Sequence, residues 1–238
     1  VIIQSFTFCG TTNPASYEGA EIIFVDSEID TWNMCPIALE NALIENKSKN
    51  IKAIIPVHLY GMPAKIDHIK NLADSFKIPI IEDAAEALGS NFKGQSCGTF
   101  GILSALSFNG NKIITTSGGG AIVSPLNKYI EKARFLATQA RDKAPHYQHS
   151  QIGYNYRMSN IVAGIGCGQL EVLDNRVEKR RSNNKLYRDF FKNIDGISFQ
   201  TEPNDNFFSN YWLTTILIDP KKTGGIDREK VRLKLDSK

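Results

Sequence analysis

The sequence predicts an α/β protein with a mostly parallel sheet sandwiched between helices, followed by part of a smaller α+β domain. Up to about residue 125, short β-branched runs alternate with polar segments of helical periodicity. The runs are apolar throughout, as expected for a sheet that is covered on both faces. With 238 residues and 42% hydrophobic content, the chain can bury one sizeable core.

The elements of the sheet follow from these runs. A helix is expected between the third and fourth strands, because the apolar residues of the segment 66–76 fall on one helical face. A strand, a helix and a second parallel strand predict a right-handed crossover. The expected strands, in chain order, are residues 1–3, 22–26, 52–58, 78–83 and 103–108.

The second half is expected to be mainly helical before the pattern changes after Asp195-Gly196. One helix is predicted over residues 129–141. A much longer one is predicted over residues 159–192, where Gly164, Gly166 and Gly168 would permit close packing. A strand over residues 211–218 and a helix starting over 227–235 then belong to the smaller domain.

Composition and charge argue against several classes of protein. The 28 basic and 25 acidic residues are scattered, apart from Lys179-Arg180-Arg181, so we expect no nucleic-acid surface. The four cysteines lie far apart, with neither a C-x-x-C pair nor a histidine at ligand spacing, which argues against zinc and predicts free thiols. No apolar stretch reaches the roughly 18 residues of a membrane span, and the first residues lack a signal pattern. We expect a cytoplasmic protein.

Polar side chains follow three of the expected strands. His58 ends one strand, Asp83 the next and Ser107 a third, with Lys112 shortly after it. Ligands of open parallel sheets bind beyond the carboxyl ends of the strands. One crevice could therefore hold an imidazole, a carboxylate, a hydroxyl and an amine.

Asp83 lies among small and apolar neighbours, so its carboxylate needs a cationic or donor partner. A protonated pyridinium nitrogen would be such a partner, and this ion pair makes pyridoxal phosphate (PLP) an electron sink. A helix N-cap or a buried salt bridge with an arginine is the commoner explanation for a lone aspartate after a strand.

The segment 107–120 brings an amine and a hydroxyl into one turn. The strand ends in Ser107, turns through Asn109-Gly110-Asn111 and presents Lys112 before three glycines. A lysine amine in a dry or cationic site condenses with carbonyls, and Ser107 can donate to a phosphate near glycine backbone. The residues fit a hairpin with a surface lysine equally well.

Six blocks of the chain closely resemble, in the same order, the DegT/StrS family of PLP-dependent sugar-nucleotide aminotransferases. The resemblance covers nearly the whole chain and implies the PLP-transferase fold of type I. The blocks are SFTF at 5–8, YEGAEIIFVD at 17–26, AIIPVHLYGMPA at 53–64, IEDAAEALGS at 81–90, SFNGNKIITTSGGG at 107–120 and IGYNYRMSN at 152–160.

The resemblance implies a role for each matching residue around the cofactor. Lys112 would form the Schiff base with PLP, and Asp83 would hold its ring nitrogen. Ser107 would bind the phosphate, Phe8 would stack on the ring and Glu86 would lie near it. Lys112 and Asp83 are thus the expected catalytic residues.

The resemblance also implies a homodimer. Asn155 and Arg157 fall in a segment that, in the family, reaches toward the partner's cofactor phosphate or substrate. We expect Asn155 at the cofactor, and Arg157, Tyr156 and Asn109 at the substrate. His58 belongs to a motif that the family keeps for packing at a strand end.

Residues outside the motifs are expected to be structural. His146 and His149 should lie in an exposed loop, and Trp32 and Trp212 should be packing aromatics. Trp212 follows Ser209-Asn210-Tyr211 in a pattern that the family also shows.

Against the family pattern, this chain is expected to be incomplete. The N-terminal turn that donates backbone amides to the phosphate should precede Val1, and the end of the small domain should follow Lys238. Ser117 stands where the family often has a glutamate. We expect a large PLP-binding domain over residues 1–175, and a linking helix with the beginning of the small domain over 176–238.

The activity implied is transfer of an amino group from glutamate to a nucleotide-linked keto sugar, with Lys112 as the general base. The motifs look closest to enzymes that aminate UDP-linked 4-keto-6-deoxy N-acetylhexosamines for bacterial glycans. One alternative is a PLP-dependent sugar dehydratase of the same fold, although in several of these a histidine replaces the lysine. Another is a non-catalytic regulatory protein that senses PLP or a sugar. A nicotinamide-dependent oxidoreductase is excluded, because no G-x-G-x-x-G follows a strand.

Overall fold

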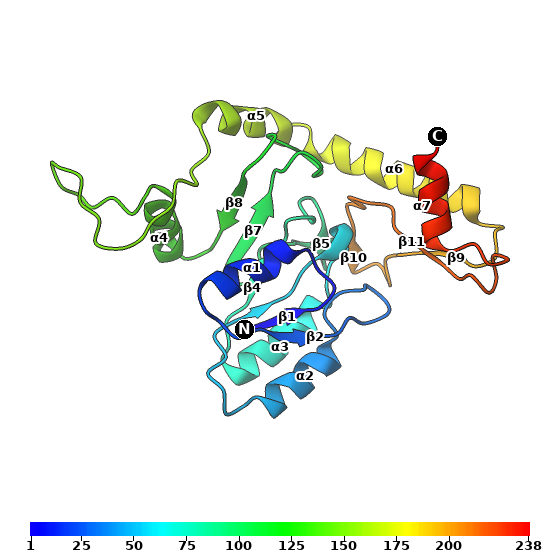
Figure 1. Ribbon diagram of the computed structural model, residues 1–238, viewed down its shortest axis with the longest axis horizontal. Helices are drawn as coiled ribbons and strands as arrows, with labels where there is room; N and C mark the ends of the chain where they lie inside the picture. The colour runs from blue at the N-terminus through cyan, green and yellow to red at the C-terminus, as the bar shows by residue number, and fades with distance from the viewer.

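The computed structural model describes residues 1–238 and shows an α/β body built on a largely parallel sheet (Figure 1). Two three-stranded sheets are joined by parallel bridges, Ile54 with Ile80 and Val57 with Asp83. Only the last strand of the joined sheet runs antiparallel to its neighbour. In spatial order the strands are β2 (Ile23–Val25), β1 (Ile2–Gln4), β3 (Ile54–Ile55), β4 (Ile81–Asp83), β7 (Leu103–Ser107) and β8 (Gly120–Val123). The predicted α/β class is confirmed.

The main core lies between the first strands and two helices, α2 (Pro36–Glu45) and α3 (Ile66–Phe76). α3 begins and ends at the predicted residues, and Lys77 ends it in the left-handed conformation (φ 58°). Burial of these side chains supplies the hydrophobic stabilisation that holds the sheet in place. The residues that meet there include Ile2, Val25, Ile54, Leu39, Leu43, Ile66 and Ile69.

The long helix predicted over residues 159–192 is wrong, because the chain forms two helices, α5 (Asn160–Leu170) and α6 (Leu173–Phe191). Val172 separates them with non-helical angles (φ −112°, ψ 13°). The new direction lets Leu173 and Val177 pack on the cluster around Phe108. This tertiary contact has no signature in the periodicity of the sequence.

Two other predictions needed correction at their ends. The helix expected over residues 129–141 is α4 (Asn127–Ala137), because Gln139 and Ala140 both have positive φ (62° and 50°). The strand expected over residues 211–218 is reduced to β11 (Ile216–Ile218). Tyr211 has a φ of 44°, which no strand residue adopts.

The remaining elements surround this body. β9 and β11 form an antiparallel pair beside α7 at the far end of α6, whereas β10 returns to pair with β5 (Figure 1). The division at residues 175 and 176 stays a prediction, and the β5–β10 pairing crosses it. No helix of the structure is both long and apolar enough to cross a membrane. The bounds are α1 (Cys9–Tyr17), η1 (Leu59–Gly61), β5 (Asn91–Phe92), β6 (Gln95–Ser96), β9 (Ile197–Phe199), β10 (Phe207–Phe208) and α7 (Arg228–Asp236).

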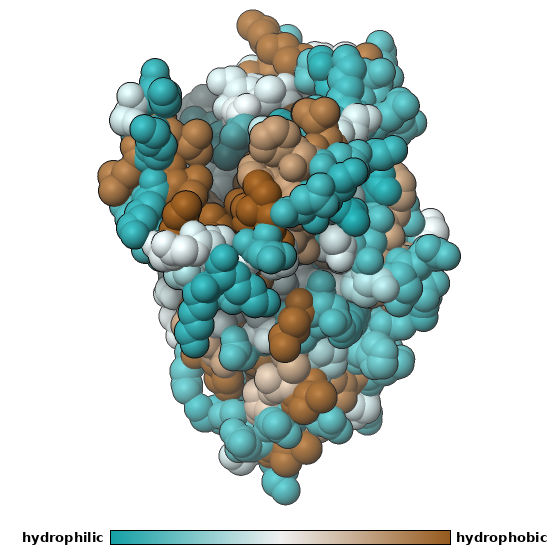
Figure 2. Space-filling view, turned by 90° about the vertical axis from the view of Figure 1, so that its right-hand side faces the viewer, coloured by the Kyte–Doolittle hydropathy of each residue, from teal (hydrophilic) through white to brown (hydrophobic).

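The end of the molecule that carries α7 exposes hydrophobic side chains. Figure 2 shows this face, where hydrophobic patches lie among hydrophilic side chains. Leu217 of β11 and Leu233 and Leu235 of α7 are all more than half exposed.

Candidate active site

Asp83 ends β4, and each of its carboxylate oxygens already has one donor. The hydroxyl of Thr11 donates to Oδ2 across 2.5 Å, and the amide of Ala85 donates to Oδ1 across 3.1 Å. Asp83 takes part in no ion pair, so the arginine partner considered above is absent. A carboxylate has room for about four hydrogen bonds. The half-buried Asp83 can therefore accept a further, cationic donor.

Helix α1, which the sequence analysis did not predict, brings two side chains to this point. Phe8 is its N-cap residue and is 73% exposed. Thr11 follows three residues later, a spacing that puts both on one side of the first turn. The Thr11 hydroxyl has only one proton and donates it in the hydrogen bond to Asp83, so the hydroxyl of Thr7, 2.7 Å away, is the donor to Thr11. The three-residue spacing between Phe8 and Thr11 is the sequence signal that could have identified Thr11 as a residue of the site.

Lys112 lies in the loop between β7 and β8, which pair as an antiparallel hairpin. Its side chain is only 12% exposed, so the alternative of a surface lysine is wrong. Nζ lies 3.6 Å from Oε1 of Glu86 and 4.1 Å from the ring centroid of Trp212. The amine thus faces a carboxylate and an aromatic ring at the same end of the sheet as Asp83.

Glu86 is held in place by the loop that follows β3. The amide of Tyr60, which has a left-handed φ of 58°, donates to Oε2 across 2.6 Å. Burial raises the pKa of Glu86, and the charge of Asp83 raises it further, against the opposing effects of the Tyr60 amide and Lys112. The protonated form of Glu86 is therefore favoured more than in water.

His58 does not share the crevice with Asp83, contrary to one possibility raised by the sequence. Successive strand residues point to opposite faces, so Glu82 and Asp83 face different surroundings. His58 is fully buried with Nε2 3.0 Å from Glu82, while its Nδ1 accepts from the amide of Ala64. The ring therefore carries its proton on Nε2, which donates to Glu82. The packing role expected for His58 agrees with this geometry.

Glu82 links β4, which ends in Asp83, to neighbouring loops through four hydrogen bonds. Oε1 accepts from the amides of Phe100 and Gly101, and Oε2 accepts from His58 and Gly98. Burial alone would raise the pKa of Glu82, but these donors hold it below its ordinary value. Glu82 is thus a buried carboxylate that keeps β4 and the segment after β6 together.

Ser107 and Asn109 form the start of the loop that carries Lys112. The oxygen of Ser107 accepts from the amide of Asn109 (3.3 Å), and the carbonyl of Asn109 accepts from the amide of Lys112 (3.0 Å). The hydroxyl proton of Ser107 remains available to an anion. Asn109 itself is exposed.

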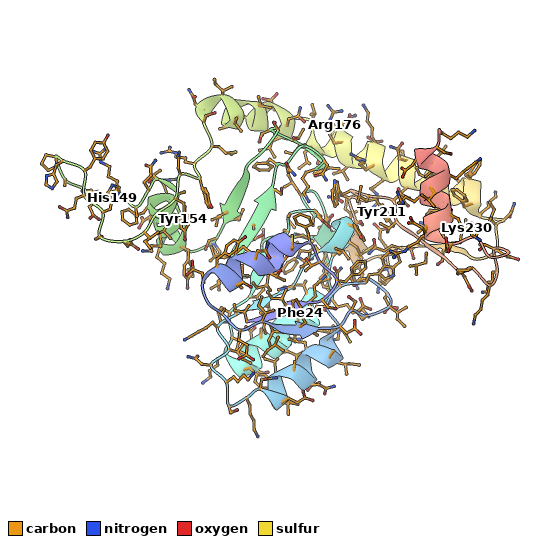
Figure 3. The ribbon with its side chains drawn as sticks, in the orientation of Figure 1. Phe24, His149, Tyr154, Arg176, Tyr211 and Lys230 are labelled. Carbon is orange, nitrogen blue, oxygen red and sulfur yellow. The ribbon has the colours of Figure 1, made fainter.

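Asn155, Tyr156 and Arg157 make no hydrogen bond or ion pair with Asp83 or Lys112, although the next residue, Met158, packs against the cluster of Phe108, Ile113 and Ile114. Asn155, Tyr156 and Arg157 are all exposed, and Asn155 forms an isolated bridge with Thr138. The ring of Tyr156 stacks on that of Tyr154, with centroids 5.0 Å apart. In Figure 3 Tyr154 lies beside α4, on the other side of the view from Tyr211.

The loop after α4 also carries the two histidines that were expected to be exposed. His146 and His149 are both exposed, and Figure 3 shows His149 toward the tip of the loop. Their predicted place is confirmed.

Comparisons with known proteins show the family to which the chain belongs. The chain matches the DegT/DnrJ/EryC1/StrS aminotransferase family over residues 1–238. It is 57% identical over 221 residues to EpsN of Bacillus subtilis (strain 168), provisionally named a pyridoxal phosphate-dependent aminotransferase. It is 39% identical over 238 residues to GDP-perosamine synthase of Escherichia coli O157:H7. It is 38% identical over 196 residues to UDP-4-amino-4,6-dideoxy-N-acetyl-beta-L-altrosamine transaminase of Campylobacter jejuni (strain 81-176).

These relatives are longer than the chain. The matches cover 92%, 100% and 81% of this chain but only 57%, 62% and 52% of the three relatives. The chain thus spans little more than half of their length.

Solved structures share the fold. A DegT DnrJ EryC1 StrS aminotransferase from Brucella abortus gives a TM-score of 0.86 at 28% identity, covering 99% of this chain and 61% of that one. DesI with its TDP-sugar product gives a TM-score of 0.88 at 26% identity, covering 99% of this chain and 58% of that one. The GDP-4-keto-6-deoxymannose-3-dehydratase ColD gives a TM-score of 0.85 at 25% identity, covering 99% of this chain and 63% of that one. The fold is that of these enzymes, and the chain belongs to the DegT/DnrJ/EryC1/StrS aminotransferase family.

Proposed function

We propose that the full-length protein is a PLP-dependent aminotransferase that moves an amino group from glutamate to a nucleotide-linked keto sugar. The observation that carries this proposal is the nearly buried amine of Lys112, placed beside Glu86 and at the same end of the sheet as Asp83. The membership of the family, whose relatives include sugar aminotransferases, supports it.

PLP would supply an aldehyde for covalent attachment and a ring that withdraws electrons from the substrate carbon. Asp83 has a free acceptor site for a ring nitrogen, and the exposed face of Phe8 is available for stacking. Ser107 would donate its hydroxyl to the phosphate. Lys112 would bind the aldehyde, and once released it would move the proton as a general base.

The acceptor that we propose is a UDP-linked 4-keto-6-deoxy N-acetylhexosamine. The relative from Campylobacter is named for a UDP-linked amino sugar, and the segment 152–160 carries the motif that resembles such enzymes. Asn109 lies exposed near Lys112, where it could contact the sugar. Comparing UDP- and GDP-linked keto sugars as acceptors tests this choice, because the relative from Escherichia coli is named for a GDP-linked product.

We further propose a symmetric homodimer that completes each site. Asn155, Tyr156 and Arg157 are exposed and make no hydrogen bond or ion pair with Lys112 of their own chain, so they are available to the site of a partner. Exposed apolar residues flank them in the sequence, and exposed apolar surface is typical of an interface. These are Ile152, Tyr154, Ile161 and Ile165, at 84%, 40%, 73% and 49% exposure.

One experiment tests the activity and separates it from its alternatives. The protein incubated with PLP should gain an absorption band that glutamate removes, and borohydride reduction should leave a pyridoxyl group on Lys112 in peptide mass spectra. Lys112→Ala should abolish both signals. Retention of a reducible adduct at the site in Lys112→Ala would refute the role of Lys112.

Product analysis then distinguishes the classes of function. An aminotransferase releases an amino sugar and 2-oxoglutarate in equal amounts, whereas a dehydratase releases a keto sugar that has lost a hydroxyl. A regulatory protein would bind PLP or the sugar without turnover. Either of the last two results would replace the proposal.

A further inference from the structure

Residues 209–212, which we call the SNYW segment, form a buried polar connection far from Lys112 in sequence. Ser209 and Asn210 are fully buried, and Tyr211 and Trp212 are each 5% exposed. From the sequence alone, Trp212 is expected to be a packing aromatic in a pattern that the family also shows. The hydrogen bonds of the segment show that it contacts both loops around the amine of Lys112.

Asn210 holds the turn that carries Glu86. Its Nδ2 donates to the carbonyls of Glu86 and Leu88, each across 2.9 Å, and its backbone amide donates to Ser90 Oγ, also across 2.9 Å. Gly61 allows this approach, because a Cβ there would lie 1.8 Å from Asn210 Oδ1. Asn210 therefore fixes the backbone on the carboxylate side of the amine.

Trp212 holds the opposite loop. Its indole Nε1 donates to the carbonyl of Asn111 across 2.6 Å, and its ring centroid lies 4.1 Å from Nζ of Lys112. The amide of Trp212 donates to Asn210 Oδ1 across 2.7 Å, which joins the two halves of the segment. The left-handed φ of Tyr211 (44°) reverses the chain between them, and a non-glycine residue keeps such a conformation only where its surroundings enforce it.

We propose that the SNYW segment positions Lys112, with Trp212 confining the amine beside Glu86 whenever it is not bonded to a cofactor. A carboxylate 3.6 Å away and an aromatic face at 4.1 Å both attract a cationic amine. The lysine side chain has many rotamers, and the two contacts restrict it to one place. The amine would then return to the same position after each release. The catalytic consequence rests on the proposed function, whereas the confinement itself does not.

The test measures how fast the amine of Lys112 is chemically labelled in the cofactor-free protein. Reductive methylation with formaldehyde and cyanoborohydride, followed by peptide mass spectrometry, gives the labelling rate of Lys112 relative to exposed Lys70. Trp212→Leu removes both the ring and the N–H, and Lys112 should be labelled about tenfold faster. Trp212→Phe keeps an aromatic face without the N–H, so its labelling rate should lie between those of the wild type and Trp212→Leu. Trp32→Phe removes the other tryptophan of the chain and should leave the rate unchanged.

Turnover provides the second measurement. Trp212→Leu should lower kcat for the glutamate half-reaction more than it raises KM, and Trp212→Phe should recover part of kcat. Wild-type labelling of Lys112 in folded Trp212→Leu would overturn the proposal, and if that variant does not fold, wild-type labelling and kcat in Trp212→Phe would overturn it. A failure of PLP to bind Lys112 would refute the proposed function but leave the labelling result valid.

Discussion

The hydroxyl of Thr11 donates to Oδ2 of Asp83 across 2.5 Å and thereby links helix α1 to the carboxyl end of β4. Because Thr11 uses its proton in this bond, its oxygen can accept from the hydroxyl of Thr7, 2.7 Å away. The second carboxylate oxygen of Asp83 is occupied by the Ala85 amide. The plane of the carboxylate is thus set by two donors before any ligand binds.

Thr11→Val should weaken the orientation of Asp83 without changing the volume of the side chain. The loss of a hydrogen bond to a charged group predicts that the glutamate half-reaction slows by about tenfold. Thr11→Ser keeps the hydroxyl and should restore the rate. Single-turnover absorbance measurements give both rates, and equal rates for the Val variant and the wild type would contradict this role.

Asp83→Ala should leave Lys112 able to bind PLP but slow the glutamate half-reaction by orders of magnitude. The reason is that the ring nitrogen loses its counter-charge and the ring no longer withdraws electrons effectively. Borohydride trapping on Lys112 checks that the cofactor still binds. Near-normal transamination by Asp83→Ala would refute the assignment of Asp83.

Glu82→Gln should destabilise the protein at neutral pH by about 2–4 kcal/mol, because the amide NH₂ would face backbone donors. The folded-state pKa of Glu82 is lowered, so its stabilising contribution is present above the ordinary value of 4.5 and is lost as the pH falls through the folded-state pKa. The difference in unfolding free energy should therefore shrink below about pH 4.5. Urea unfolding measures it, with exposed Glu45→Gln as the control. A difference that is independent of pH would contradict the assigned pKa.

Gly61→Ala should disrupt the contact that fixes Asn210. The added Cβ would lie 1.8 Å from Oδ1 of Asn210, and the φ of Gly61 is 90°. Gly94 has a similar φ of 78° with open space around it, so Gly94→Ala carries only the backbone strain of about 1 kcal/mol. Gly61→Ala should lower the thermal unfolding midpoint more than Gly94→Ala. Equal shifts of the midpoint in the two variants would show that Asn210 can move without a loss of stability.

Co-expression of Lys112→Ala and Asn155→Ala chains should recover activity that neither variant has alone. In a twofold dimer with shared sites, a heterodimer contains one intact site. With random pairing, about a quarter of wild-type activity is expected. Separately tagged chains allow the heterodimer to be purified and assayed. Inactive heterodimers, or an active enzyme that sediments as a monomer, would exclude shared sites.

The sequence by itself predicted the parts of this protein that depend on local pattern and on motifs. The apolar runs identified the parallel strands, and the periodicity of residues 66–76 identified α3 because its buried face repeats at helical spacing. The six motif blocks identified the family. They also singled out Asp83, Glu86 and Lys112, which the fold brings to one end of the sheet.

The tertiary structure decided which side chains contact one another. Thr11 meets Asp83 across 72 positions of the chain, and Trp212 meets Asn111 across 101. It also decided where the long helix breaks: α5 and α6 are separated at Val172, and Val177 of α6 packs on the cluster around Phe108. Such contacts depend on the paths of distant segments. A periodic pattern reports only which face of one segment is buried, so it contains no information about the partner.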